Sequence, residues 1–176
     1  MEKLAPHQKH YRAKMRQHGW MDTNSEMIWP ADVAGRQKMA RGLFGVKMAS
    51  NVDYWTLLAE DELDGTHQAP WASPDKAVRP EAAHHREIFQ SLKPEQREAF
   101  RELLRYVMKG QLYSFCLALD QTLGGSTVSL EQPNDNHGDR LEIHSPSQEE
   151  LHHEQHQWLE NFSILFGKDE RYATEA

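Results

Sequence analysis

Histidines and glutamates gather at residues 149–156, and their spacing is that of a partial metal site. His152 and His156 are four residues apart, which places their rings one above the other on one face of a helix. Glu149 and Glu160 extend the same polar flank by further steps of three and four residues. Imidazoles and carboxylates are the ligand types that Zn²⁺, Ni²⁺ and non-haem iron use in proteins. The stretch therefore predicts one part of a metal site, with Zn, Ni or Fe as the candidate ion.

A metal site on this flank would need a further ligand from another element, and Glu81 and His84 are the first candidates. Their Glu-x-x-His spacing is also used in carboxylate-bridged di-iron bundles. His85 falls on the apolar face of the same predicted helix, where we expect a packed core group. His153 is expected to point away from His152. With eleven histidines in 176 residues, the competing explanation is an ordinary solvent-facing helix flank.

The element that positions these side chains is a predicted helix that closes the chain. Residues 147–150 match a capping box, and Gly167 is a stop signal after a helix that runs to about Phe166. Rotation by about 100° per residue gathers the large apolar side chains on one side. These are Leu151, Trp158, Leu159, Phe162, Leu165 and Phe166. The helix is therefore expected to bury one side and to present His152 at its rim.

The rest of the chain is also predicted to be mainly helical. Helices are predicted at residues 6–18, 30–44, 50–63, 80–92 and 94–123. Ser50 is a candidate N-cap, Gly35 and Gly42 weaken the second helix, and Gly110 predicts a kink or break in the last. Residues 127–131 and 140–144 alternate polar with apolar side chains around the turn-forming residues 133–139, which predicts a β-hairpin before the closing helix.

The predicted fold is a mainly α single domain, residues 1–176, with about five to six helices and one inserted β-hairpin. Its core is expected from residues 97–123 and 151–166, with a contribution from Tyr54, Leu57 and Leu58. Residues 1–30 form a basic, partly irregular arm, residues 64–79 a proline-rich linker, and residues 168–176 a loose tail.

Charge is distributed unevenly along the chain, whose net value is −7. Residues 1–50 carry nine Lys and Arg against four Asp and Glu, whereas residues 51–176 carry eleven against twenty-three. The basic arm could touch a polyanion, but packing on the protein's own acidic body is favoured, so a nucleic-acid partner is disfavoured. The acidic body instead suggests a protein partner with a basic surface.

No common nucleotide-binding, hydrolase, zinc-protease or C-x-x-C motif is present in the sequence, so an enzymatic function is disfavoured. Cys116, the single cysteine, lies among apolar residues and is expected to be a buried structural thiol. The N-terminus lacks the apolar segment of a signal peptide and no stretch approaches 18 apolar residues, which predicts a cytoplasmic protein outside the membrane.

These observations favour a small acidic, non-enzymatic protein-binding domain, such as an inhibitor, an immunity-type protein or an adaptor, that acts on a basic partner. The alternative is a divalent-metal-binding helical protein, a hydrolase or an oxidase, that uses the histidine and glutamate ligands on its helix faces.

Overall fold

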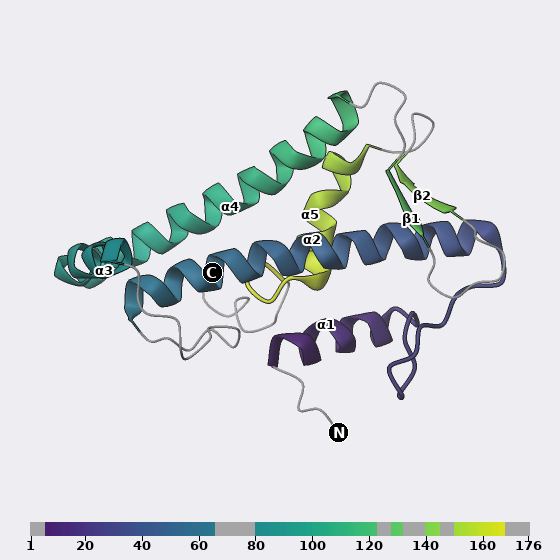
Figure 1. Ribbon diagram of the computed structural model, residues 1–176, viewed down its shortest axis with the longest axis horizontal. Helices are drawn as coiled ribbons and strands as arrows, with labels where there is room; N and C mark the ends of the chain where they lie inside the picture. The colour runs from purple at the N-terminus through teal and green to yellow at the C-terminus, as the bar shows by residue number, and fades with distance from the viewer. Residues whose placement is uncertain (1–5, 66–79, 123–127, 132–139, 145–149, 168–176) are drawn as a thin grey trace. The chain divides into compact units, whose positions relative to one another are not determined.

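The computed structural model describes residues 6–65, 80–122, 128–131, 140–144 and 150–167. Five α-helices lie within these ranges, and the predicted mainly helical class is confirmed (Figure 1). The helices are α1 Pro6–Gln17, α2 Val33–Asp64, α3 Pro80–Ser91, α4 Pro94–Thr122 and α5 Leu151–Phe162. The strands β1, Val128–Glu131, and β2, Arg140–His144, pair antiparallel.

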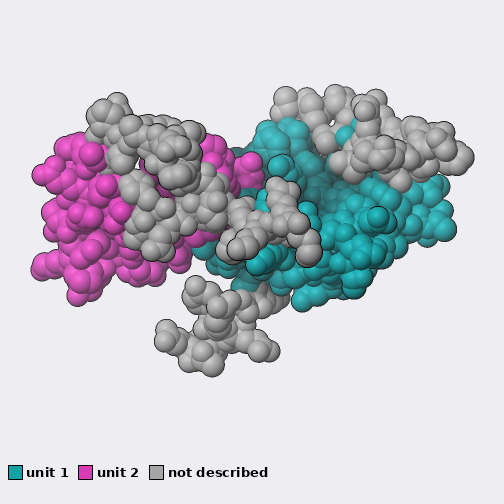
Figure 2. Space-filling model, turned by 60° about the horizontal axis from the view of Figure 1, so that its bottom comes forward, with its two compact units in different colours: residues 1–50, 112–176 teal, residues 51–111 magenta. Residues whose placement is uncertain are grey.

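The chain divides into two compact units, drawn in different colours in Figure 2. Unit 1 comprises residues 1–50 and 112–176, and unit 2 comprises residues 51–111. Because the boundaries fall inside α2 and α4, both helices contribute residues to both units.

Helix α2 is continuous where the sequence predicted two helices, at 30–44 and 50–63 (Figure 1). Ser50, the predicted cap of the second, lies inside α2, where its Oγ donates a hydrogen bond to the carbonyl of Lys47 at 2.9 Å. Val46 and Ala49, which lie between the two predicted helices, are buried, so this part of α2 also packs against the rest of the protein. Helix α2 ends at Asp64, one residue after the predicted end, and Gly65 follows it with a φ of +72°.

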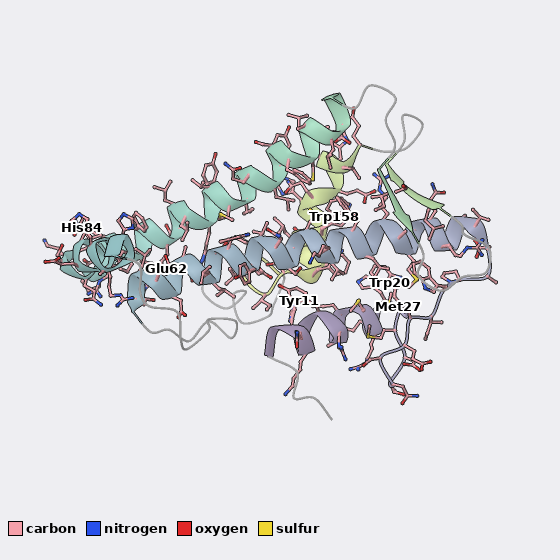
Figure 3. The ribbon with its side chains drawn as sticks, viewed as in Figure 1. Tyr11, Trp20, Met27, Glu62, His84 and Trp158 are labelled. Carbon is pink, nitrogen blue, oxygen red and sulfur yellow. The ribbon has the colours of Figure 1, made fainter. Side chains whose placement is uncertain are left out.

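The glycines of α2 allow tryptophan rings to pack directly on the helix backbone. A Cβ at Gly42 would overlap the ring of Trp20, and a Cβ at Gly45 would lie 2.5 Å from Cδ1 of Trp158. Figure 3 shows both tryptophans beside α2. Although glycine weakens a helix locally, here it permits these two contacts.

Helix α4 runs without interruption through Gly110, so the predicted break there is wrong. Helix α5 ends at Phe162, four residues before the predicted end. The reason is Ser163, which leaves the helical conformation (φ −68°, ψ 146°) and whose Oγ accepts hydrogen bonds from the N–H groups of Leu165 and Phe166.

The buried apolar side chains are concentrated in unit 1. Those that belong to unit 1, within the described ranges, are Tyr11, Met21, Met39, Ala40, Val46, Ala49, Leu112, Cys116, Leu141, Ile143, Leu151, Trp158, Leu159 and Phe162. The prediction for α5 is confirmed at Leu151, Trp158, Leu159 and Phe162. The prediction that α4 supplies the core along its whole length is wrong, because its first half leaves its apolar stripe exposed.

The register of β1 and β2 places Leu130 opposite Leu141 and Glu131 opposite Arg140, with an irregularity between Val128 and Ser129. Leu141 and Ile143, two residues apart on β2, are both buried, as the alternation of a half-buried strand requires.

Several predictions fall outside the described residues. These are most of the linker at 64–79, the turn at 133–139, the capping residues 147–149 and the tail at 168–176.

Candidate functional site

Unit 2 contains a pocket of about 410 Å³, within the ~300–1,000 Å³ range of ligand pockets. Seven of its nine lining residues are apolar. The lining consists of Ala59, Glu62, Leu63, His85, Ile88, Phe89, Leu92, Phe100 and Leu104. The end of α2, the length of α3 and the start of α4 all contribute to it. We call this feature the apolar pocket.

Aromatic packing sets the floor of the apolar pocket. Phe89, which is 2% exposed, meets the ring of Phe100 edge to face with 5.7 Å between the ring centroids. The guanidinium of Arg101 lies 5.5 Å from the centroid of Phe89 and adds a cation–π contact. At the C-terminal end of α2, Arg86 of α3 donates from Nε to the carbonyl of Glu62 at 3.2 Å. Figure 3 labels Glu62 near this end and His84 on α3.

Ion pairs within unit 2 hold α4 against the second half of α2. Arg105 Nε lies 2.8 Å from Glu60 Oε1, and Arg101 Nη2 lies 2.6 Å from Asp64 Oδ1. These arginines are half-buried. Among the described residues of unit 2, the exposed charged side chains are therefore Glu62, Glu87, Lys93, Glu95, Glu98 and Glu102. Five carboxylates against one ammonium make the exposed charge of unit 2 acidic, and of these residues Glu62 lines the apolar pocket.

Exposed apolar side chains continue from the apolar pocket along α4. Leu103 is 57% exposed, Tyr106 75% and Val107 46%, while Ile88 and Phe100 are partly exposed within the pocket lining. Single exposed apolar residues are ordinary, but a contiguous set beside a pocket is typical of a surface that binds another molecule.

His152, the first predicted ligand, lies in the first turn of α5 and is held by a carboxylate from α4. Asp120, whose side chain is 1% exposed, lies with Oδ2 2.8 Å from His152 Nδ1. The same carboxylate accepts hydrogen bonds from the backbone N–H groups of Leu151 and His152, both at 2.9 Å. Glu150, the N-cap residue by position, makes no side-chain cap bond. Asp120 therefore caps α5 from a distant part of the sequence.

Asp120 and His152 are paired like the acid and the base of a nucleophilic triad, but the nearby thiol of Cys116 is not a suitable nucleophile. Cys116 lies one turn before Asp120, is 0% exposed and is confirmed as a buried free cysteine. Burial, with a smaller contribution from the charge of Asp120, raises the pKa of the Cys116 thiol to about 12. A thiol with this pKa stays protonated at neutral pH, so it is a packing group and not a nucleophile.

The second nitrogen of His152 faces Glu150 and the neighbouring histidine. Nε2 lies 3.6 Å from Oε2 of Glu150, and Nε2 of His153 lies 3.8 Å from the same oxygen. The ring centroids of His152 and His153 are 4.1 Å apart, so the expectation that these rings point apart is wrong. In the first turn of α5, rotation about the side-chain bonds brings together rings whose Cα positions differ by about 100°.

Among the predicted ligands on the described part of α5, His156 and Glu160 do not join this group. Within the part of the chain that the structure describes, the one cluster of three ligand side chains is Glu150, His152 and His153. His156 is exposed and Glu160 is half-buried, both further along α5. The position of Glu149 and the side chain of Glu81 lie outside the described residues.

Histidines 84 and 85 belong to unit 2. His84 is exposed, and its part in a metal site stays a prediction. His85 shares its face with the apolar residues of α3, as expected, but it is exposed at the apolar pocket and is not a packed core group. The prediction failed because periodicity shows which residues share a face and not whether that face is covered.

The basic N-terminal helix packs within unit 1. Tyr11 is 8% exposed, and His10 Nε2 lies 2.9 Å from the carbonyl of Phe162. His18 stacks on Trp20 at a centroid distance of 4.6 Å. Burial lowers the pKa of His18, and the charges of Lys14 and Lys38 lower it further. These contacts use aromatic and imidazole side chains of α1 and of the turn that follows it, while Lys9 and Arg16 of α1 are exposed.

Within the described residues, none of the helices combines the length and the apolarity that a membrane span requires.

Comparison with models of protein families, with curated proteins and with solved structures finds no match for this chain. The function of the chain is therefore inferred from the arrangement of its own side chains.

Proposed function

We propose that this chain is a non-enzymatic protein-binding domain whose apolar pocket holds one face of a basic, amphipathic helix of a partner protein. The observation that carries the proposal is the apolar pocket together with the excess of exposed carboxylates on the same unit. An amphipathic helix with apolar side chains on one face and Lys or Arg on the other fits both features.

The extent of the exposed apolar surface supports a helix in preference to a small molecule. A small ligand would be enclosed by the pocket itself, whereas Leu103, Tyr106 and Val107 extend the apolar surface beyond the pocket lining. Several apolar anchors along one partner helix would use the pocket and this extension together. Each fully buried anchor contributes about 1.5–3 kcal/mol before the costs of association are subtracted.

The exposed charge of unit 2 supports a basic partner. Exposed carboxylates accelerate association with a cationic surface and contribute little to affinity once they are screened by salt. Binding to such a partner should therefore weaken only moderately as the ionic strength rises, because the apolar contacts remain.

A fluorescent amphipathic peptide of leucine and lysine, about 18 residues or five helical turns long, is a direct probe. Fluorescence anisotropy would compare the wild type with Ile88→Asp, which places a charge on a half-exposed wall of the apolar pocket. Val33→Asp is the matched control, because Val33 is 64% exposed on α2 in unit 1 and the charge change is the same.

We expect Ile88→Asp to weaken peptide binding at least tenfold, about 1.4 kcal/mol, and Val33→Asp to leave it unchanged. If attraction between net charges alone held the peptide, both substitutions would strengthen binding by adding a negative charge. That outcome, or equal affinity in all three proteins, would contradict the proposed function. Affinity capture from the native host with the same three proteins would then identify the natural partner.

A further inference from the structure

The three-residue cluster at the start of α5 has the ligand types of a transition-metal site. Glu150, His152 and His153 each present one ligand atom, and these atoms lie within 4.8 Å of one another. Two imidazole nitrogens and one carboxylate oxygen form a three-ligand set that open zinc sites use, with water in the fourth position.

The distances inside the cluster fit ligands around an ion better than hydrogen bonds. The separations of Glu150 Oε2 from the Nε2 atoms of His152 and His153 are 3.6 and 3.8 Å. Both exceed the length of a good N–H···O hydrogen bond. Ligands about 2.0–2.2 Å from a tetrahedral zinc ion lie roughly 3.3–3.6 Å from one another, so small side-chain rotations would complete the geometry.

Asp120 supplies the outer partner that metal-binding histidines usually have. A carboxylate accepts hydrogen bonds, so Nδ1 of His152 carries the proton in this pair and Nε2 keeps its lone pair when the ring is neutral. Because the Asp120 side chain is 1% exposed and also bonds the backbone of α5, the ring of His152 is held in one orientation. This arrangement fixes the tautomer and the orientation of the ligating imidazole.

The electrostatic balance of the cluster also accommodates a divalent cation. The N-terminus of a helix is its positive end and by itself opposes a cation. Here Asp120 accepts from two of the first N–H groups of α5, and Asp120 and Glu150 together bring two negative charges. The carboxylates therefore offset the helix dipole at the place where the metal would lie.

We propose that Glu150, His152 and His153 bind one Zn²⁺ ion, with Asp120 orienting His152. Borderline ions such as Co²⁺ and Ni²⁺ would bind the same nitrogen and oxygen ligands, whereas Mg²⁺ and Ca²⁺ prefer oxygen ligands alone. The site lies in unit 1 and the apolar pocket in unit 2, so either proposal can fail without the other.

Isothermal titration calorimetry of the full chain without a histidine tag, with zinc alone as the titrant, tests the site. We expect one ion per chain. His153→Ala and Glu150→Gln alter exposed side chains and should each lower the affinity at least tenfold, while the melting temperature without metal stays unchanged. His156→Ala is the matched control, since it removes an exposed histidine from the same helix and should leave the affinity unchanged.

Zinc affinity should also fall as the pH is lowered, because protons compete with the metal for the imidazole nitrogens. Absence of zinc binding by the wild type would overturn the proposal. Binding that survives in both the His153 and the Glu150 variants, or that is lost in His156→Ala, would overturn it as well.

Discussion

At the scale of single residues, the buried thiol of Cys116 shows how packing determines chemistry. Its pKa is raised to about 12, so the folded state keeps the thiol proton at a pH where the unfolded chain, with a thiol pKa near 9.0, has lost it. Above pH 9.0 the unfolded state is therefore favoured by its own deprotonation. The contribution of Cys116 to stability should be constant below that pH and should decrease as the pH rises from 9.0 towards 12.

The measurement is the free energy of unfolding in urea for the wild type and Cys116→Ala at pH 8 and pH 10. The substitution leaves a small cavity and should destabilise the protein at pH 8. The difference between the two proteins should shrink at pH 10 by up to about 1.4 kcal/mol, because one pH unit corresponds to that free energy for one proton. The same difference at both pH values would mean that the thiol titrates normally in the folded state.

The surroundings of two helical glycines, Gly45 and Gly110, predict opposite effects of substitution by alanine. Ala at Gly45 would place its Cβ 2.5 Å from Trp158, whereas a Cβ at Gly110 meets nothing within 4 Å. Gly45→Ala should therefore destabilise the protein by about 1–3 kcal/mol through overpacking. Gly110→Ala should stabilise it by up to about 1 kcal/mol, because alanine is the better helix former.

Thermal unfolding of these two variants beside the wild type checks the sign of each effect. Lower melting temperatures for both would indicate that Gly110 has a packing role, and higher ones for both would indicate that Trp158 can move away from α2.

At the scale of elements, α5 depends on a cap from α4. Asp120→Ala removes the acceptor of two backbone N–H groups and of the His152 ring, so we expect a loss of about 1–3 kcal/mol in stability. Glu150→Ala is the matched control, because Glu150 occupies the N-cap position but makes no cap bond, and its loss should lie within about 0.5 kcal/mol. Urea denaturation of both variants measures the difference. Equal losses would contradict the assignment of the cap to Asp120.

This cap also shows how far sequence reasoning reaches. The spacing of residues on α5 is local, so the sequence predicted its helix, its apolar side and a chemical role for His152. The partner of His152 is 32 residues away, and no local pattern identifies it. The same limit applies to α4, because an apolar stripe such as Phe100, Leu103 and Val107 has the same period whether another element covers it or not.

Glycine patterns were misread for a related reason. Gly42 and Gly110 both appeared as weak points of helices, yet one accommodates Trp20 and the other lies in open space within an intact helix. Whether a side chain from elsewhere in the chain packs on a helical glycine decides its role, and composition and periodicity do not reveal this.

At the scale of the whole molecule, the two units differ in how much apolar surface they bury. Fourteen buried apolar side chains belong to unit 1, whereas unit 2 has Val52 and Phe89 among its described residues. Unit 2 relies in addition on half-buried ion pairs, and pairs near the surface contribute only about 0–1 kcal/mol each. A unit with few buried apolar contacts opens more readily than its neighbour.

Hydrogen–deuterium exchange should therefore be faster in α3 than in α5, two helices of the same length that belong to different units. Peptides that cover residues 83–91 should exchange well before those that cover residues 151–162, because opening of unit 2 exposes less apolar surface to water. Adding the leucine–lysine peptide should slow exchange at 83–91 and leave exchange at 151–162 unchanged, since a ligand stabilises the folded state of the unit that it binds. Equal protection of both helices in the free protein would show that unit 2 is as stable as unit 1 and does not depend on a partner to complete its apolar pocket.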